Sequence, residues 1–132
     1  MKNSISIIII FLLINALCIW DIIFVNNTLE YMHTQTHDIF DFVVYNDISD
    51  SENYETIRSQ VVALEKYWES KENALCLVIS RKDMQPITDH LQYLRSAIIL
   101  HSQEDAITHS RLLHANVKTV DKITEFRLDN IF

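Results

Sequence analysis

Glycine is absent from this chain of 132 residues, and proline occurs only once, at Pro86. Tight hairpin turns and phosphate-binding loops depend on glycine, so its absence argues against an all-β fold and against a Rossmann-type nucleotide-binding fold. Only two cysteines are present, Cys18 and Cys76, which is too few for a disulfide framework. These absences predict an all-α protein.

Positive charge is scarce in the first part of the chain. The net charge is −7, and residues 21–57 carry eight acidic residues and no basic one, whereas residues 58–132 carry ten of each. Nucleic-acid binding requires a basic face, and electrostatic binding to anionic lipid requires a basic cluster. We therefore expect no nucleic-acid partner, and we interpret the acidic stretch as a solvated helix surface.

One long apolar segment dominates the sequence. Residues 5–25 are apolar apart from Ser6, Asn15 and Asp21. As a helix, this segment would extend about 30 Å, which matches the hydrocarbon core of a bilayer. The sequence predicts a transmembrane anchor over residues 1–25 and one further domain over residues 26–132, which is large enough to bury a core.

The flanks of this segment favour a signal anchor that is not cleaved. A cleaved signal peptide needs small residues in a pattern such as Ala-x-Ala, and a lipoprotein signal needs small residues before its cysteine. Cys18 is instead preceded by Asn15, Ala16 and Leu17. A buried core helix of a soluble protein is the remaining alternative, because a single basic residue, Lys2, is a weak signal for membrane targeting.

The charges on either side of the anchor predict its orientation. Lys2 and the amino terminus precede the apolar segment, and the eight acidic residues of residues 21–57 accompany or follow its end. Cytoplasmic flanks carry an excess of lysine and arginine. We therefore expect a single-pass protein of the cell membrane, with its N-terminus in the cytoplasm and the bulk of the chain outside.

Beyond the anchor, apolar residues recur at helical spacing. The pattern predicts helices over residues 28–46, 52–79, 84–101 and 104–128, of which the first continues the membrane helix outward. Because the connections are short, we expect antiparallel neighbours in a small helical bundle. The four apolar stripes comprise Leu29, Met32, Thr36, Ile39 and Val43; Tyr54, Ile57, Val61, Leu64, Trp68, Leu75 and Val78; Ile87, Leu91, Leu94 and Ile98; and Ala106, Leu113, Val117, Val120 and Ile123.

Polar residues between the stripes predict where the helices begin. Ser49 with Glu52 has the pattern of a capping box before the second helix. Asp83 is the expected cap of the third helix. Ser102 with Asp105 is the expected cap of the fourth.

Histidines are the nearest approach to catalytic or metal-binding chemistry. His33, His37 and Asp41 are spaced so that they share one face of a helix, where they offer three potential zinc ligands. No His-Glu-x-x-His motif accompanies them, so a bound metal would not imply hydrolysis. We interpret these residues as polar positions on an exposed helix, and we assign no metal site.

A second histidine group has the same interpretation. His101 and His109 flank Glu104 and Asp105 across an expected turn. The serines are scattered with no nucleophile elbow, and no set of nucleophile, base and orienting group can be assembled. The sequence therefore predicts no enzyme and assigns no catalytic residue, cofactor or cofactor-binding residue.

Two polar residues interrupt the apolar patterns. Lys71 takes an apolar position in the second stripe, where it either lays its methylenes over the edge of the core or pairs with Glu65 or Glu72. Asn15 lies near the middle of the anchor. Its amide is either tolerated by a lone helix or bonded to another membrane helix.

The cysteines are expected far apart. Cys18 should lie in the bilayer and Cys76 near the end of the second helix, so a bridge between them is geometrically implausible. Each is interpreted as a small buried apolar residue. The alternative for an unpaired Cys76 outside the cytoplasm is a link between two copies of the chain.

A series of landmarks runs along nearly the whole chain: the apolar anchor, Trp68, Glu72, Leu75, Asp83, Ile87, Leu91, Leu94, Ile98, Asp105, Ala106, Asn130, Ile131 and Phe132. Their order resembles the domain of unknown function 4363 family, which consists of small single-anchor helical proteins of clostridia and their relatives. The resemblance rests mostly on packing residues, and it implies an anchored helical fold and a bacterial source. Members tend to accompany a YetF-like polytopic membrane protein. This chain departs from the family at residues 80–82, Ser-Arg-Lys, where a histidine is expected, so no role of that histidine is carried over.

Two hypotheses about function follow. The first is a scaffold or accessory subunit whose bundle docks on another membrane protein, such as a YetF-like one, or on a second copy. Residues 130–132 then either pack on the bundle or contact the partner. The second is a sensor that binds a small ligand between the helices, in a cavity lined by Trp68, Tyr67 or Tyr93.

Overall fold

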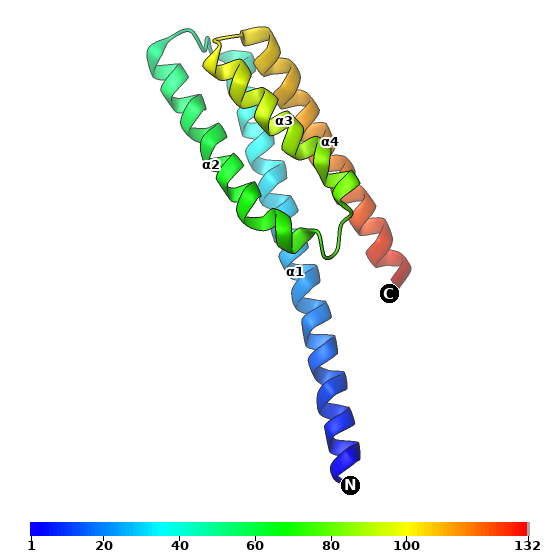
Figure 1. The fold of residues 1–132 in the computed structure, drawn as a ribbon. Helices are drawn as coiled ribbons and strands as arrows, with labels where there is room; N and C mark the ends of the chain where they lie inside the picture. The colour runs from blue at the N-terminus through cyan, green and yellow to red at the C-terminus, as the bar shows by residue number, and fades with distance from the viewer. Residues whose placement is uncertain (132) are drawn as a thin grey trace.

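A computed structural model describes residues 1–131, except for the side chains of Leu128 and Ile131. These residues form four helices and no strand, which confirms the predicted all-α class. The helices are α1 (Lys2–Tyr45), α2 (Ser51–Leu75), α3 (Arg81–Ile99) and α4 (Gln103–Ile131), and Figure 1 shows α2, α3 and α4 grouped around the C-terminal half of α1.

Helix α1 is one uninterrupted helix of 44 residues. The predicted continuity of the apolar segment with the next helix is confirmed, because the first apolar stripe, from Leu29 to Val43, lies in the same helix and is entirely buried. Val25 is the first buried residue of α1. The N-terminal part therefore projects from the bundle (Figure 1).

The apolar N-terminal part of α1 is long enough to cross a membrane. Its most apolar window of 18 residues is 0% buried, with a mean hydropathy of 2.7. The side chains of Phe11, Leu12 and Leu13 are each about 60% exposed. Apart from a membrane or a partner, nothing in water stabilises such a surface, which distinguishes this segment from the buried core helix of a soluble protein.

The helices surround one apolar core. Helix α1 packs against α2 and α4, and α3 packs against the same two helices, whereas the diagonal pairs α1 with α3 and α2 with α4 make no close backbone contact among residues 1–131. Trp68 is the largest of the fully buried side chains. Apolar residues from all four helices join it in a single cluster, as helix-bundle packing requires.

Two of the predicted capping residues are wrong, by one position at α2 and by three positions at α3. The N-cap of α2 is Asp50, whose carboxylate accepts a hydrogen bond from the backbone N–H of Glu52, whereas Ser49 donates its own N–H to Asp47. At α3 the cap is Ser80. In both cases a suitable side chain closer to the first helical residue takes the capping position.

Helix α3 begins at Arg81 because Ser80 and Asp83 bond reciprocally. The Asp83 N–H donates to the Ser80 hydroxyl, which donates in turn to the Asp83 carboxylate at 2.9 Å. Asp83 therefore occupies the third helical position instead of the cap. The predicted pair at α4 is present, since the Ser102 hydroxyl donates to the Asp105 carboxylate at 2.9 Å.

Helix α2 ends four residues earlier than predicted. It stops at Leu75, and residues 76–80 form the connection to α3. Ile79 replaces Val78 as the last core residue, being 2% exposed against 38%. The backbone N–H groups of Leu77 and Val78 donate to the carbonyls three residues earlier, those of Ala74 and Leu75. These bonds tighten the backbone, so the apolar stripe loses its helical period there.

A single glutamine joins the two turns at the end of the bundle far from the amino terminus. The side-chain amide of Gln103 donates to the backbone carbonyls of Val43 and Asn46, and its oxygen accepts from the N–H of Ile48 at 2.9 Å. These bonds connect the α1–α2 turn to the start of α4. The neighbouring His101 has a positive φ of 54°, which closes the α3–α4 turn without glycine.

Candidate functional site

The exposed apolar part of α1 is the most prominent surface feature of the chain. Asn15 lies within it, and its side-chain amide donates to the backbone carbonyl of Phe11 at 2.7 Å. This bond satisfies one N–H of the amide inside its own helix. A lone helix therefore accommodates Asn15 at reduced cost, while the amide oxygen can still accept a hydrogen bond.

The first histidine group is completed by a residue from another helix. His33 and His37 of α1 pack against His114 of α4, with ring centroids 4.6 and 5.6 Å apart respectively. His114 Nδ1 lies 2.9 Å from the hydroxyl of the buried Thr36. Asp41, the third predicted ligand, lies 3.2 Å from His37 Nε2. We call His33, His37 and His114 the α1–α4 histidine cluster.

A second pair of histidines joins α3 to α4. The Nδ1 atoms of His90 and His109 lie 3.3 Å apart, and Tyr93 packs against both rings. His101, the other histidine flanking Glu104 and Asp105 in the sequence, instead packs on Tyr54 with ring centroids 4.5 Å apart. His109 therefore faces a helix that the sequence pattern did not indicate.

Burial and neighbouring charge lower the pKa of two of these imidazoles and so favour their neutral form. Burial is the largest cause that lowers the pKa of His90, followed by the nearby His109, whereas Asp89 opposes the shift. Burial also lowers the pKa of His114, followed by His33 and His37. Lys118 lowers the pKa of His114 further, and Asp41 raises it.

The histidine clusters do not assemble a metal centre in this conformation. Among residues 1–131 no group of three or more histidine, cysteine, aspartate or glutamate side chains has the geometry to hold a metal ion. The rings of His33 and His37 instead pack at a tilt against the ring of His114, and the His90 and His109 pair shares one hydrogen bond.

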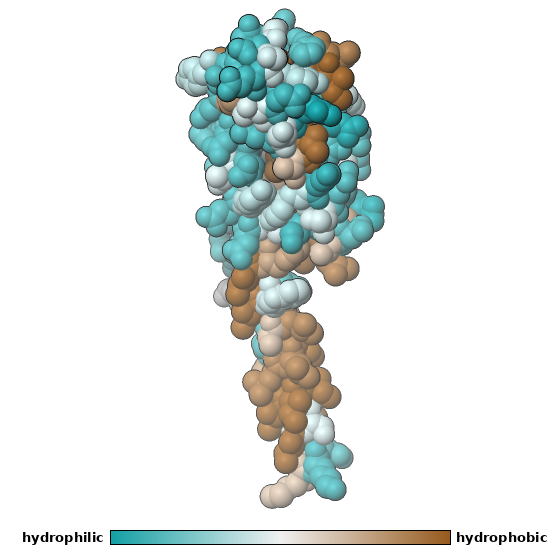
Figure 2. All heavy atoms as spheres, turned by 90° about the vertical axis from the view of Figure 1, so that its left-hand side faces the viewer, coloured by the Kyte–Doolittle hydropathy of each residue, from teal (hydrophilic) through white to brown (hydrophobic). Residues whose placement is uncertain are grey.

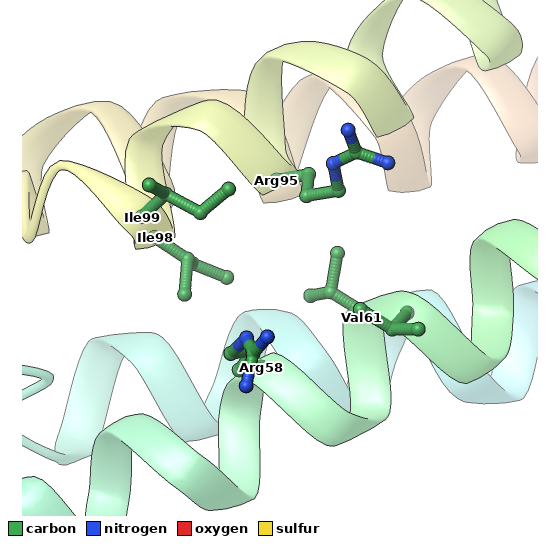
Figure 3. Close-up of a pocket in the computed structure, with 6 residues that line it drawn as sticks. Arg58, Val61, Arg95, Ile98 and Ile99 are labelled. Carbon is green, nitrogen blue, oxygen red and sulfur yellow. The ribbon is translucent and has the colours of Figure 1, made fainter.

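A shallow groove lies between α2 and α3. Its cavity volume is about 270 Å³. Figure 3 shows Val61 and Ile98 pointing into the space between the two helices, with Arg58 and Arg95 beside them. Arg95 also bonds to Glu65 at 2.9 Å. We call this feature the α2–α3 groove, and it is lined by Arg58, Val61, Val62, Arg95, Ile98 and Ile99.

The aromatic residues predicted to line a ligand cavity have different positions. Trp68 is 1% exposed and its indole N–H donates to the hydroxyl of Thr88 at 2.9 Å, so it belongs to the core. Tyr67 stacks on Tyr31 with centroids 4.0 Å apart. Tyr93 borders a hollow of about 180 Å³ on the surface of α3 and α4, together with His109.

The remaining residues singled out in the sequence are Lys71 and the two cysteines. The ammonium of Lys71 lies 5.5 and 5.6 Å from the ring centroids of Phe24 and Tyr67, so it contacts aromatic faces. Of the two alternatives for Lys71, the ion pair is not found among the described residues, because Glu65 bonds to Arg95 and Glu72 accepts a hydrogen bond from Thr88. Cys18 is exposed on α1 and Cys76 is half-buried, and both are free thiols.

The predictions for the C-terminus concern residues 130–132. Asn130 is exposed. The side chain of Ile131 and the whole of Phe132 lie outside the described residues, so their packing stays a prediction.

A scan against protein-family models finds none that matches the chain, and searches of the curated proteins and of the solved structures find no match either. The resemblance to the domain of unknown function 4363 family therefore stays a prediction, and the function is argued from the geometry.

Proposed function

We propose that this chain is a single-pass membrane protein whose antiparallel helical bundle lies outside the cytoplasm and serves as a scaffold or accessory subunit. Residues 1–25 act as a signal anchor in the lipid bilayer, and residues 26–132 form the docking domain. The observation that carries the proposal is the continuity of α1, whose exposed apolar part becomes a core helix of the bundle without a break.

The orientation rests on the charge asymmetry across the anchor. Lys2 precedes the apolar segment, and acidic residues follow it. An alkaline phosphatase fused after residue 132 should therefore be active in a bacterial host. An inactive phosphatase fusion, together with an active cytoplasmic reporter at the same position, would overturn the orientation.

The docking surface that best fits a protein partner is the outer face of α3. Tyr93 is 52% exposed, Ile99 50% and Leu100 76%, and this apolar face adjoins Arg58 and Arg95 of the α2–α3 groove. Exposed apolar residues bordered by arginine are typical of protein interfaces. A partner with an apolar and acidic surface would complement this face. A YetF-like polytopic membrane protein or a second copy of the chain is the proposed partner.

A pull-down from native membranes tests the docking role. Tagged full-length protein is extracted in a mild detergent, and the recovered proteins are identified by mass spectrometry. We expect a stoichiometric membrane partner with the wild type, and loss of that partner with Leu100→Asp but not with Thr119→Asp on the exposed side of α4. Recovery of the chain alone, from an extraction that preserves other membrane complexes, would overturn the scaffold role.

The contribution of the anchor is tested separately. Asn15→Leu removes the amide that another membrane helix would bond to. If the partner or a second copy is held through the anchor, this variant should lower the association signal in a bacterial membrane two-hybrid assay. Ser6→Leu, nearer the end of the segment, is the matched control, and an equal signal in all three proteins would exclude a role for the Asn15 amide.

The second candidate function is a sensor of small ligands, and the α2–α3 groove favours it. Two guanidinium groups beside an apolar floor match a ligand with an apolar chain and a carboxylate. Octanoate should then raise the melting temperature of the full-length protein in detergent, and Arg58→Gln with Arg95→Gln should abolish the shift. An equal shift with the double variant would show binding outside the groove.

A further inference from the structure

We infer that the bundle makes a second contact with the membrane, in addition to the anchor, through the turn between α2 and α3. The contacting residues are Leu77, Val78, Arg81 and Lys82, which we call the α2–α3 rim. The partner is the interfacial layer of a phospholipid bilayer. This inference rests on the proposed membrane anchoring of α1.

The position of the rim follows from contacts between α1 and α2. Tyr67 stacks on Tyr31, and four residues further along α2 the ammonium of Lys71 lies over the ring of Phe24. As α2 advances, its partners on α1 therefore move toward the amino terminus. Helix α2 runs down toward the exposed apolar part of α1.

The rim extends beyond the level of Phe24. Another four residues of α2 follow Lys71 before the helix ends at Leu75, which adds about 6 Å along the axis. The connection formed by residues 76–80 comes next, so Leu77 and Val78 lie level with the last apolar residues of the predicted anchor. Figure 1 shows this turn at the end of the bundle from which α1 projects.

The side chains of the rim suit the boundary between lipid and water. Leu77 is 87% exposed and Val78 38%, and neither is needed for the core, which Ile79 completes. Arg81 and Lys82 follow directly and are exposed at the start of α3. Apolar side chains beside arginine and lysine place their carbons among acyl chains and their charges at the phosphates.

Figure 2 shows apolar atoms along the projecting helix and again at the adjacent end of the bundle, with paler residues between them. Apolar atoms so close to a membrane-spanning segment are most simply covered by the same lipid. The apolar residues on α3, Ile99 and Leu100, lie at the opposite end of that helix. They serve as a comparison within the same chain.

The opposite side of the same end is acidic. Helices α1 and α4 border a hollow lined by Asn26, Glu30, His33, Asp121, Glu125 and Asp129. Carboxylates are repelled by anionic head groups, and they lose hydration when buried in lipid. The bundle should therefore rest on the membrane along the α2–α3 rim, with the acidic hollow facing water.

The test uses single-cysteine variants of the full chain in a background with Cys18→Ala and Cys76→Ala. Leu77→Cys reports the rim and Leu13→Cys the anchor. Leu100→Cys reports another highly exposed leucine, at the far end of the bundle. Each variant is labelled with bimane and reconstituted in phosphatidylcholine nanodiscs. Quenching by acyl chains brominated near the head group, which report position 77, and by chains brominated near the terminal methyl, which report position 13, is then compared with quenching in unbrominated lipid.

We expect strong quenching at positions 13 and 77 and none at position 100. Quenching at position 13 alone would overturn the rim contact and leave the anchor intact. If quenching at positions 13 and 77 were as low as at position 100, both the rim contact and the membrane anchor would be overturned. Quenching at 77 without 13 would support the rim contact and overturn the anchor as the cause of attachment.

The basic residues are tested through lipid charge. Replacing part of the phosphatidylcholine by phosphatidylglycerol should increase quenching at position 77. Arg81→Glu with Lys82→Glu should remove this increase, whereas Arg111→Glu, an exposed position further up α4, should not. An increase that survives the double substitution would overturn the role of Arg81 and Lys82 in the contact.

Discussion

The Nδ1 atoms of His90 and His109 lie 3.3 Å apart across the interface between α3 and α4. One ring must donate and the other accept at this distance, so at least one of the two imidazoles is neutral. Burial and the proximity of His109 lower the pKa of His90, and Asp89 compensates only in part. Protonation of both rings would remove the hydrogen bond and place like charges together between two packed helices.

Acid should therefore destabilise the bundle. Because the pKa values of His90 and His114 are lowered in the folded chain, the unfolded chain binds more protons below the ordinary imidazole pKa of about 6.5. These two histidines therefore add their full contribution to the free energy of unfolding above that pH. The contribution is lost as the pH falls below it toward the lowered pKa values of the folded chain. Melting curves of the full-length protein in detergent, measured at about pH 8 and about pH 5, report the difference.

Histidine substitutions separate this effect from general acid denaturation. His90→Gln should reduce the difference in melting temperature between the two pH values, and His101→Gln, at an exposed turn, should leave it unchanged. If His90→Gln kept the full pH dependence, the histidine pair would not be its source.

Thr88→Val should destabilise the bundle by about 1–3 kcal/mol, because the buried indole N–H of Trp68 would lose its acceptor. Valine has nearly the same shape as threonine, so little packing is lost. Thr119→Val, at an exposed site on α4, should change the free energy of unfolding by less than about 0.5 kcal/mol. Chemical denaturation followed by Trp fluorescence measures both, and equal values for the two variants would contradict the assigned bond.

Gln103→Leu should loosen the end of the bundle far from the amino terminus. The substitution removes the side-chain oxygen that accepts a hydrogen bond from the buried N–H of Ile48, which should lower the free energy of unfolding by about 1–3 kcal/mol. Hydrogen exchange in residues 46–50 should become faster, whereas exchange in the middle of α2 should change much less. Gln92→Leu, at an exposed position on α3, is the matched control and should leave exchange in residues 46–50 unaltered.

Lys71→Met should lower stability by about 0.5–1 kcal/mol, because it removes the ammonium over Phe24 and Tyr67 but keeps most of the side-chain volume. Lys66→Met, at an exposed site on the same helix, should have no measurable effect. Denaturation in two salt concentrations distinguishes the cation–π contact from long-range electrostatics, since only the latter would weaken strongly with salt.

The helices were predictable because their signal is periodic and redundant. All of Leu29, Met32, Thr36, Ile39 and Val43 are buried, as the spacing indicated. Helix ends depend on single hydrogen bonds, and there several polar residues compete for one capping position. Nothing in the order of Ser49, Asp50 and Ser51 reveals which side chain will reach a free backbone N–H, so the cap of α2 was misassigned by one residue.

The histidine contacts were only partly predictable. Helical spacing placed His33 and His37 on one face, but the third ring, His114, comes from a helix almost 80 residues away along the chain. One signal was present: His114 follows the buried Leu113 and His90 precedes the buried Leu91, positions that border a helix interface. Which histidines then meet depends on the vertical register of packed helices, and periodicity within one helix carries no information about that register.

Helix α1 extends from Lys2 to Tyr45 without a proline, a glycine or a break in its helical geometry. At 1.5 Å per residue its 44 residues form a rod of about 66 Å. Such a rod behaves as a lever: each degree of tilt about its amino-terminal end displaces Tyr45 sideways by about 1 Å. A change in lipid thickness or in the packing of a neighbouring membrane helix, which tilts the first half, would thus be transmitted mechanically and enlarged at the turn where Gln103 ties the helices together.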